Sequence, residues 1–347
     1  LSKDRPFFIF PKQAQKGYRV EPIEVTIATQ SIHPSDLWRG YWGIQVLHAG
    51  QILGLFELLR EAKTVEEISG ELHLERRYIE LWCEAAVDFH LVEREGERFR
   101  APEMYLEWLQ RSGGFTQSHL QLSARMNETL RAVFGGRALP EPPISLRLLL
   151  QKNLQANYQW TFQEAASAHP RVNDILTRAG RVMEVGCGVG YGLSHLRNYH
   201  PKLELFGLES DYECAQEAER FTKAVIHVGE FPAERFSRDF DLIVCFRSLT
   251  ASSDPKRLLQ ECAKLLHPSG FIVLGSEFQD EQDRRKGRAR SKGERLAYNI
   301  LAGEFLVNSY TRESLCALVN EVGLKVEREV EAPDWATPLL ICSRAQT

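Results

Sequence analysis

The sequence predicts an α/β protein with a doubly wound, mostly parallel sheet in its C-terminal half and a mainly helical N-terminal half. Two observations support this. After residue 180, short apolar runs alternate with helical stretches, a pattern that specifies parallel strands joined by crossover helices. Before residue 113, the pattern is helix, helix, helix and hairpin, which is the order of a winged helix.

The composition is that of an ordinary globular chain. It has 347 residues, 43% hydrophobic and 26% charged, with a net charge of −4, and its length suits about two domains. No apolar run approaches the ~20 residues of a membrane span, and no signal peptide is evident. The seven cysteines are scattered without a C-x-x-C pair, so we expect a reducing, cytoplasmic setting with no disulfide or metal site.

The first helix of the winged-helix pattern is expected over 38–59, where apolar residues recur at helical spacing. Thr64 and Glu67 form a capping box for a short helix to residue 72. A longer helix is expected over 75–89 and a strand, turn and strand over 91–100. Residues 60–111 carry 8 basic and 13 acidic side chains, so this surface would repel DNA phosphates. A packing or dimerisation module is the better interpretation, and nucleic acid is an unlikely partner.

The apolar runs that predict the parallel sheet are all four to six residues long. They lie at 181–185, 203–208, 224–228, 241–246 and 271–274. The helical stretches between them are expected near 191–199, 212–222 and 255–266.

The most informative stretch is Val-Met-Glu-Val-Gly-Cys-Gly-Val-Gly-Tyr-Gly over 182–192. It is a strand that runs into a glycine turn and a helix, at the sheet edge where such folds bind ligands. A dinucleotide fingerprint needs G-x-G-x-x-G, and both registers fail because Tyr191 and Leu193 stand at the last position. A P-loop also fails, since no Gly-Lys-Ser/Thr follows.

The stretch has the form E-x-G-x-G-x-G, and it resembles motif I of class I methyltransferases that use S-adenosylmethionine. Four further segments match that family in order and spacing. Glu209 ends the second strand, and Gly-Glu-Phe follows the third strand at 229–231, where the family usually has Gly-Asp and an apolar residue. Residues 240–244 are similar to the fourth strand and 265–270 to the turn before the fifth.

The resemblance implies a Rossmann-like seven-stranded sheet and S-adenosylmethionine as cofactor. It places the ribose hydroxyls on Glu209 and the adenine at 229–231. The residues it assigns to the cofactor are Glu184, Gly186, Cys187, Gly188, Gly190, Glu209, Ser210, Gly229, Glu230, Phe231, Phe246 and Arg247. Three alternatives stay open: the glycines could serve only a tight turn, Glu209 could cap the next helix, and Glu184 could be an orienting residue.

The N-terminal half resembles the O-methyltransferase family that has an N-terminal dimerisation domain. Residues 130–136 are similar to its connector helix and glycine turn, and 158–166 to the helix beside cofactor and substrate. This implies an intertwined homodimer. It also implies four segments: an N-terminal arm (1–36), a winged-helix dimerisation domain (37–112), a helical connector lining the substrate pocket (113–178) and the methyltransferase domain (179–347).

The sequence departs from this family at the general base. Members that methylate phenols carry a His-Asp-Trp-type motif after the fourth strand, but Thr250 stands at the histidine position here. Threonine cannot accept a phenol proton near neutral pH. Replacement bases could be Glu277, His119, Tyr158 or Tyr298, each of which could equally be a packing residue. Because the sulfonium is already activated, alignment of the acceptor with the methyl group could supply much of the rate without a base.

A basic segment at 284–295 has seven basic residues and one acidic. It could be a lid that attracts an anionic substrate, or a solvated loop. It contains no aromatic residues for stacking on RNA bases.

We therefore expect methyl transfer to a small molecule, O-methyltransferase-like but with a carbon, nitrogen or sulfur acceptor left open. A biosynthetic substrate, from a natural-product or cofactor pathway, is favoured. One alternative is a repurposed fold that binds the cofactor but catalyses another reaction or none. The other is a winged-helix regulator that senses the cofactor.

Overall fold

The computed structural model describes residues 33–112, 115–125, 142–165, 169–231, 236, 239–280, 308–333 and 336–345. By its internal contacts the chain divides after Trp42, and the second unit is Gly43–Thr347. The second unit contains the sheet and the candidate site. The proposed segment boundaries stay predictions.

Helix α1 (Pro34–Ile52) carries exposed aromatic residues along its first half. Trp38, Tyr41 and Trp42 pack edge to face in sequence, with ring centroids 5.9 and 5.3 Å apart. The spacing of apolar residues predicts one continuous helix from 38 to 59. The structure instead starts a new helix, α2 (Leu55–Leu58), after Gly54, because Gly54 adopts a left-handed φ of 71° that interrupts helical geometry.

The expected helix and hairpin order is present in the N-terminal part of the second unit. The elements are β1 (Lys63–Thr64), α3 (Val65–Leu72), α4 (Arg76–Asp88), β2 (Glu93–Glu95) and β3 (Arg98–Arg100). The strands pair antiparallel in the order β1-β3-β2. The Thr64 and Glu67 capping box forms as predicted, and Phe56, Ile68 and Phe99 are among the residues buried in this small core.

Helices connect this part to the sheet. They are α5 (Glu103–Ser112), α6 (Phe115–Ala124), α8 (Ile144–Lys152), α9 (Gln155–Trp160) with a π-helical turn η1 (Thr161–Ala165), and α10 (Pro170–Thr177). The segment 130–136, similar to the family's connector, lies outside the described residues.

The sheet has seven strands in the order β6-β5-β4-β7-β8-β10-β9. The strands are β4 (Arg181–Val185), β5 (Glu204–Glu209), β6 (Val225–Val228), β7 (Phe240–Phe246), β8 (Leu266–Gly275), β9 (Leu324–Val330) and β10 (Leu339–Arg344). β10 runs antiparallel to both of its neighbours. The predicted fold class is therefore confirmed. The expected turn at 265–270 falls within β8, because Leu266 already pairs with Phe240 before a register shift.

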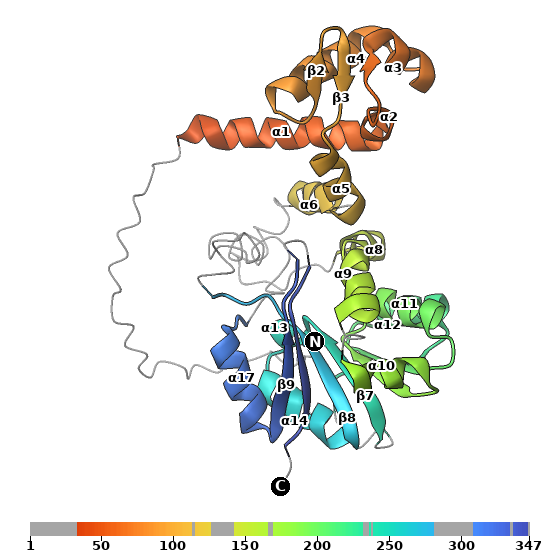
Figure 1. The fold of residues 1–347 in the computed structure, drawn as a ribbon, viewed down its shortest axis with the longest axis vertical. Helices are drawn as coiled ribbons and strands as arrows, with labels where there is room; N and C mark the ends of the chain where they lie inside the picture. Colours follow the sequence, from red (N-terminus) through yellow and green to blue (C-terminus); the bar gives the residue numbers. More distant parts are fainter. Residues whose placement is uncertain are drawn as a thin grey trace, which may run out of the picture. The chain divides into compact units, whose positions relative to one another are not determined.

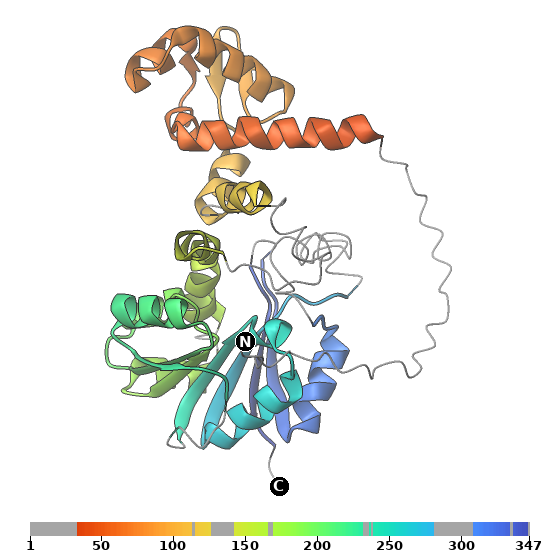
Figure 2. The same cartoon turned by 180° about the vertical axis from the view of Figure 1, so that it is seen from behind.

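Helices cover both faces of the sheet. Helices α10, α11 (Tyr191–Tyr199) and α12 (Tyr212–Thr222) lie on one face, and α13 (Ser248–Ala251), α14 (Pro255–Leu265) and α17 (Arg312–Glu321) on the other (Figures 1 and 2). Alternate residues of β4, β7, β8 and β10 pack into the two cores on opposite faces of the sheet, as Val182 and Met183 do. All seven cysteines are free and six of them are buried.

Candidate active site

A cavity of about 890 Å³ opens at the carboxyl ends of β4, β5, β6 and β7. The strand order reverses beside β4, which is where doubly wound sheets bind ligands. Helices α5, α6, α8 and α9 line it from one side, and residues of α12, α13 and α14 contribute as well. The predicted site residues in the lining are Gly186, Gly188, Glu209, Ser210, Gly229, Glu230, Phe231, Phe246, Arg247, His119 and Tyr158.

The glycine turn after β4 brings bare backbone to this cavity. Gly186, Gly188 and Gly190 have positive φ angles of 68°, 55° and 89°, which other residues rarely adopt. A β-carbon at 188 would lie 2.1 Å from Oε1 of Gln151, so the bare backbone at this position is what lets that side chain approach the turn.

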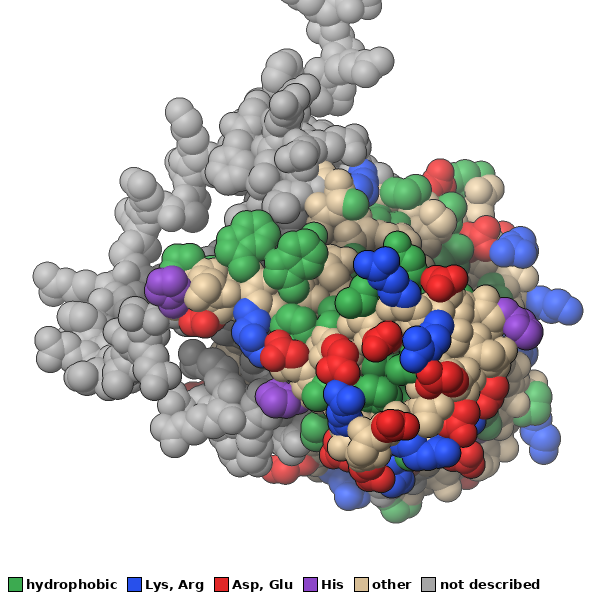
Figure 3. All heavy atoms as spheres, turned by 90° about the horizontal axis from the view of Figure 1, so that it is seen from above, with side chains coloured by type: hydrophobic (Ala, Val, Ile, Leu, Met, Phe, Trp, Pro, Cys, Tyr) green, Lys and Arg blue, Asp and Glu red, His purple; other side chains and the backbone are tan. Residues whose placement is uncertain are grey.

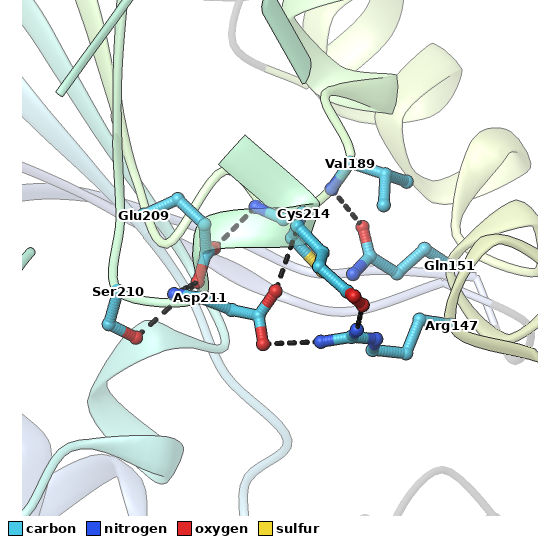
Figure 4. A network of polar contacts seen from close by, with 9 residues as sticks. Arg147, Gln151, Val189, Glu209, Ser210, Asp211 and Cys214 are labelled. Carbon is cyan, nitrogen blue, oxygen red and sulfur yellow. Dashed lines mark hydrogen bonds and ion pairs between the residues drawn. The ribbon is translucent and has the colours of Figure 1, made fainter. Parts of the chain in front are cut away.

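Glu209, at the end of β5, joins two loops. Its Oε2 accepts a hydrogen bond from the Gly188 amide at 2.7 Å, and its Oε1 accepts one from the Asp211 amide at 2.9 Å (Figure 4). Asp211 is the N-cap of α12, since its carboxylate accepts from the Cys214 amide at 2.8 Å. Glu209 is thus not the cap, and its carboxylate lies in the cavity lining beside the glycine turn.

Glu184 lies behind the cavity, together with Cys187 and Gly190. Its side chain is fully buried, and burial raises its pKa to about 8. The Tyr158 hydroxyl and the Leu193 amide oppose that shift. However, neither carboxylate oxygen meets full hydrogen-bond geometry with any described residue. Glu184 is a neutral acid at neutral pH in this structure.

Tyr158, on α9, lines the cavity between Glu184 and Phe246. Its ring centroid lies 5.1 Å from that of Phe246. Burial raises the pKa of Tyr158 well above its usual value, and the nearby Glu184 raises it further. The phenol is therefore held protonated, which suits a hydrogen-bond donor and opposes a role as a base.

Arg247 and Glu277 form an ion pair at the ends of β7 and β8. Nη2 of Arg247 lies 2.5 Å from Oε1 of Glu277, and both side chains are largely buried. Arg247 adopts a left-handed φ of 64° as the N-cap of α13. Glu277 therefore faces a guanidinium and is not part of the cavity lining in the described chain.

Thr250, at the position of the missing histidine, is turned toward the backbone. Its hydroxyl donates to the Arg247 carbonyl at 2.6 Å and its side chain is buried. Asn308 fixes the same short helix, because its amide donates to the carbonyls of Leu249 and Ser252 at 3.0 and 2.6 Å. Nothing at this position in α13 offers a proton acceptor to the cavity.

His119, on α6, lines the cavity from the side of the helical connector. Its Nδ1 lies 3.3 Å from the Ser118 hydroxyl, which also accepts a hydrogen bond from the Asn153 amide at 3.0 Å. Tyr298 and the basic segment 284–295 lie outside the described residues.

The cavity residues that sequence reasoning did not assign to the site include Arg147 and Gln151 of α8. Oε1 of Gln151 accepts a hydrogen bond from the Val189 amide at 2.7 Å. Arg147 forms ion pairs with Asp211 and Glu213 (Figure 4). The local pattern around them predicts only a helix, so no signal could have assigned them to the site.

Comparison with known proteins places this architecture in a family. Residues 155–329, half of the chain, match the methyltransferase domain family. The 3-hydroxy-5-methyl-1-naphthoate 3-O-methyltransferase of Streptomyces sahachiroi is 25% identical over 272 residues, covering 72% of this chain and 78% of that protein.

Solved structures share the fold over nearly the whole chain. The S-adenosylmethionine-dependent methyltransferase SibL aligns with a TM-score of 0.61 and 19% identity, covering 90% of this chain and 98% of that one. Human N-acetylserotonin methyltransferase in complex with SAM aligns with a TM-score of 0.59 and 18% identity, covering 92% and 99%.

The fold and the site define a class I methyltransferase. The chain belongs to the methyltransferase domain family, as an O-methyltransferase-like enzyme that acts on small molecules with S-adenosylmethionine as methyl donor. Among the described residues, no group of three His, Cys, Asp or Glu side chains could hold a metal ion. No described helix has both the length and the hydropathy to cross a membrane.

The residues at the cavity suit this cofactor. The Glu209 carboxylate can accept hydrogen bonds from two ribose hydroxyls, because a carboxylate has about four acceptor sites. The Tyr158 and Phe246 rings provide faces that attract a cation such as a sulfonium. Phe231 and the partly buried Leu258 provide apolar surface for a flat base.

Proposed function

We propose that methyl transfer takes place in the cavity at the carboxyl edge of the sheet, by in-line attack of a small-molecule acceptor on the cofactor's methyl carbon. The observation that supports this best is Glu209, which lies in the lining and is bonded to the amide of Gly188 in the glycine turn. Gly186, Gly188 and Gly190 would support the methionine part, and Gly229, Glu230 and Phe231 the adenine. Ser210, Phe246 and Arg247 would complete the cofactor contacts, with Glu184 and Cys187 behind them.

We further propose that proximity, rather than a strong base, supplies most of the rate. The Thr250 hydroxyl donates a hydrogen bond to the Arg247 carbonyl, Tyr158 is held protonated, and Glu277 is paired with Arg247. His119 is the remaining candidate base among the described residues, and Tyr298 lies outside them. An acceptor that ionises readily, such as an acidic hydroxyl or a thiol, would need only alignment.

The acceptor is proposed to carry an anionic group. The support is the basic run at 284–295, between the fifth strand of the family pattern and the next helix. A bacterial relative that methylates a hydroxynaphthoate, whose substrate name includes a carboxylate, agrees with this proposal.

A homodimer is the proposed assembly, with α1 in the interface. Leu37, Trp38 and Trp42 are 66%, 63% and 57% exposed, although such side chains are ordinarily buried. Figure 3 shows large hydrophobic side chains gathered on one exposed face. Size-exclusion chromatography with light scattering should give a dimer for the wild type and a monomer for Trp38→Glu/Trp42→Glu.

Calorimetric titration with S-adenosylmethionine tests the proposed cofactor site. Wild type should bind at micromolar concentration, and Glu209→Ala should weaken binding by about a hundredfold, since hydrogen bonds to a charged group contribute about 1.5–3 kcal/mol. Glu219→Ala, which removes an exposed carboxylate from α12, is the matched control and should bind normally. Equal affinity in Glu209→Ala and wild type would place the cofactor elsewhere.

A further inference from the structure

Helix α8 reaches the glycine turn through Gln151. Besides accepting from the Val189 amide at 2.7 Å, the Gln151 side chain occupies the space that a β-carbon on Gly188 would need. Gln151 is therefore in direct contact with the loop on which the methionine part of the cofactor is proposed to lie.

The same helix reaches the end of β5 through Arg147. Its two terminal nitrogens bind different carboxylates, Nη1 that of Asp211 and Nη2 that of Glu213. The Arg147 side chain is only 12% exposed and that of Asp211 22%, whereas that of Glu213 is 62% exposed. The inner half of this contact is thus shielded from water and the outer half is not.

Arg147 and Gln151 are one helical turn apart, so they project from the same face of α8. Gln151 is bonded to the loop after β4, and Arg147 is paired with Asp211 after β5 (Figure 4). Glu209 bridges those same two loops through Gly188 and Asp211. Helix α8 therefore crosses the proposed cofactor site and is tied down on both sides of it.

We propose that α8 is an exchange gate for the cofactor, held shut by Arg147 and Gln151. This rests on the proposed cofactor site. Detachment of the helix from both loops widens the site for S-adenosylmethionine to enter and for its demethylated product to leave, and the helix closes over either ligand with the same two contacts. Because the same contacts hold α8 with and without ligand, weakening them lowers the barrier in both directions. The equilibrium between free and bound enzyme stays nearly unchanged.

Stopped-flow mixing with S-adenosylhomocysteine, followed by tryptophan fluorescence, tests the gate without turnover. Arg147→Ala should raise the association and dissociation rate constants by about tenfold each, a change equivalent to about 1.4 kcal/mol. The Kd should change by less than about threefold. Gln151→Ala should act in the same direction.

More conservative variants test the same contacts with less risk of unfolding the protein. Asp211→Asn keeps an N-cap residue on α12 but weakens the pair with Arg147, so a smaller acceleration is expected. Glu213→Gln removes the exposed half of the contact and should accelerate exchange about twofold. Raising salt from about 0.05 to 0.5 M should speed exchange more in wild type than in Arg147→Ala, because salt screens exposed charge pairs.

Arg178→Ala is the matched control. It removes an arginine pair with Asp241, near the start of β7 at the opposite edge of the sheet, and should leave both rate constants unchanged. Unchanged rates in Arg147→Ala would overturn the gate. A rise in the dissociation rate constant alone, with a proportional rise in Kd, would also overturn the gate, because Arg147 would then bind the ligand directly. Failure of wild type to bind would instead overturn the cofactor site on which the gate depends.

Discussion

The two ends of the cavity are built in different ways. At the end proposed for the cofactor, short loops after adjacent parallel strands meet, and main-chain amides bind one carboxylate, that of Glu209. At the end proposed for the acceptor, side chains come from separate stretches of the chain, with His119 on α6 and the wall of α13 fixed by Asn308. The first end depends on backbone geometry within contiguous motifs. The second depends on how distant helices pack, so its chemistry can change while the fold stays.

The cofactor end should be the more sensitive to a single added atom. Gly188→Ala forces a β-carbon into a residue with φ of 55° and into the space occupied by Gln151. We expect cofactor affinity to fall by about a hundredfold or more, because an alanine that leaves the left-handed region shifts the turn's amides away from the proposed cofactor position, and backbone strain of this kind costs on the order of 1–3 kcal/mol. Calorimetric titration with S-adenosylmethionine measures this.

Gly70→Ala provides the matched control for that substitution. Gly70 lies within α3, and a β-carbon there would meet nothing within 4 Å. Alanine is favoured over glycine in a helix by up to about 1 kcal/mol, so this variant should bind normally and be no less stable than wild type. Normal cofactor binding by Gly188→Ala would show that the turn is not part of the cofactor site.

The same contrast explains what the sequence could predict. The glycine turn, Glu209 and the strands from β4 to β7 are specified by local patterns: period, glycine and a carboxylate at a strand end. Strands β9 and β10 were expected only from the family's seven-stranded sheet, and the break at Gly54 was missed because the flanking apolar pattern is continuous. Arg147 and Gln151 could not be predicted, since their partners are 38 to 66 residues away in the chain.

The acceptor end should tolerate loss of its histidine. If proximity dominates, the rate of methyl transfer at saturating cofactor should vary by less than about threefold between about pH 6 and 9. His119→Ala should lower kcat by less than about tenfold, below the 10²–10⁴ typical of a lost acid or base. Rates measured with a labelled methyl donor across this range check both expectations.

Glu184→Gln should accompany those rate measurements, because Glu184 itself titrates within the pH range. If the rate of methyl transfer changes tenfold per pH unit in Glu184→Gln as in wild type, and this dependence disappears in His119→Ala, His119 is the base. The acceptor end would then be as strictly determined as the cofactor end.

The last prediction concerns stability rather than binding or rate, at Glu184 beneath the glycine turn. Burial raises its pKa from the ordinary 4.5 to about 8 in the folded chain. Between those two pH values the unfolded chain releases a proton that the folded chain keeps, so stability falls as pH rises. Glu184→Gln has the same shape and no charge at any pH. The two proteins should therefore melt alike near pH 4.5, and the variant should become the more stable as pH rises, by up to about 5 kcal/mol at pH 8.5.

Thermal melts of both proteins, without cofactor, at pH 5, 7 and 8.5 measure this difference as a gap in Tm that widens by a few degrees with pH. Glu219→Gln on the exposed face of α12 is the control and should give no widening. A variant that becomes less stable than wild type at pH 8.5 would contradict the prediction. It would mean that Glu184 is ionised in the folded chain and accepts a hydrogen bond from a donor, so that a negative charge lies beneath the glycine turn.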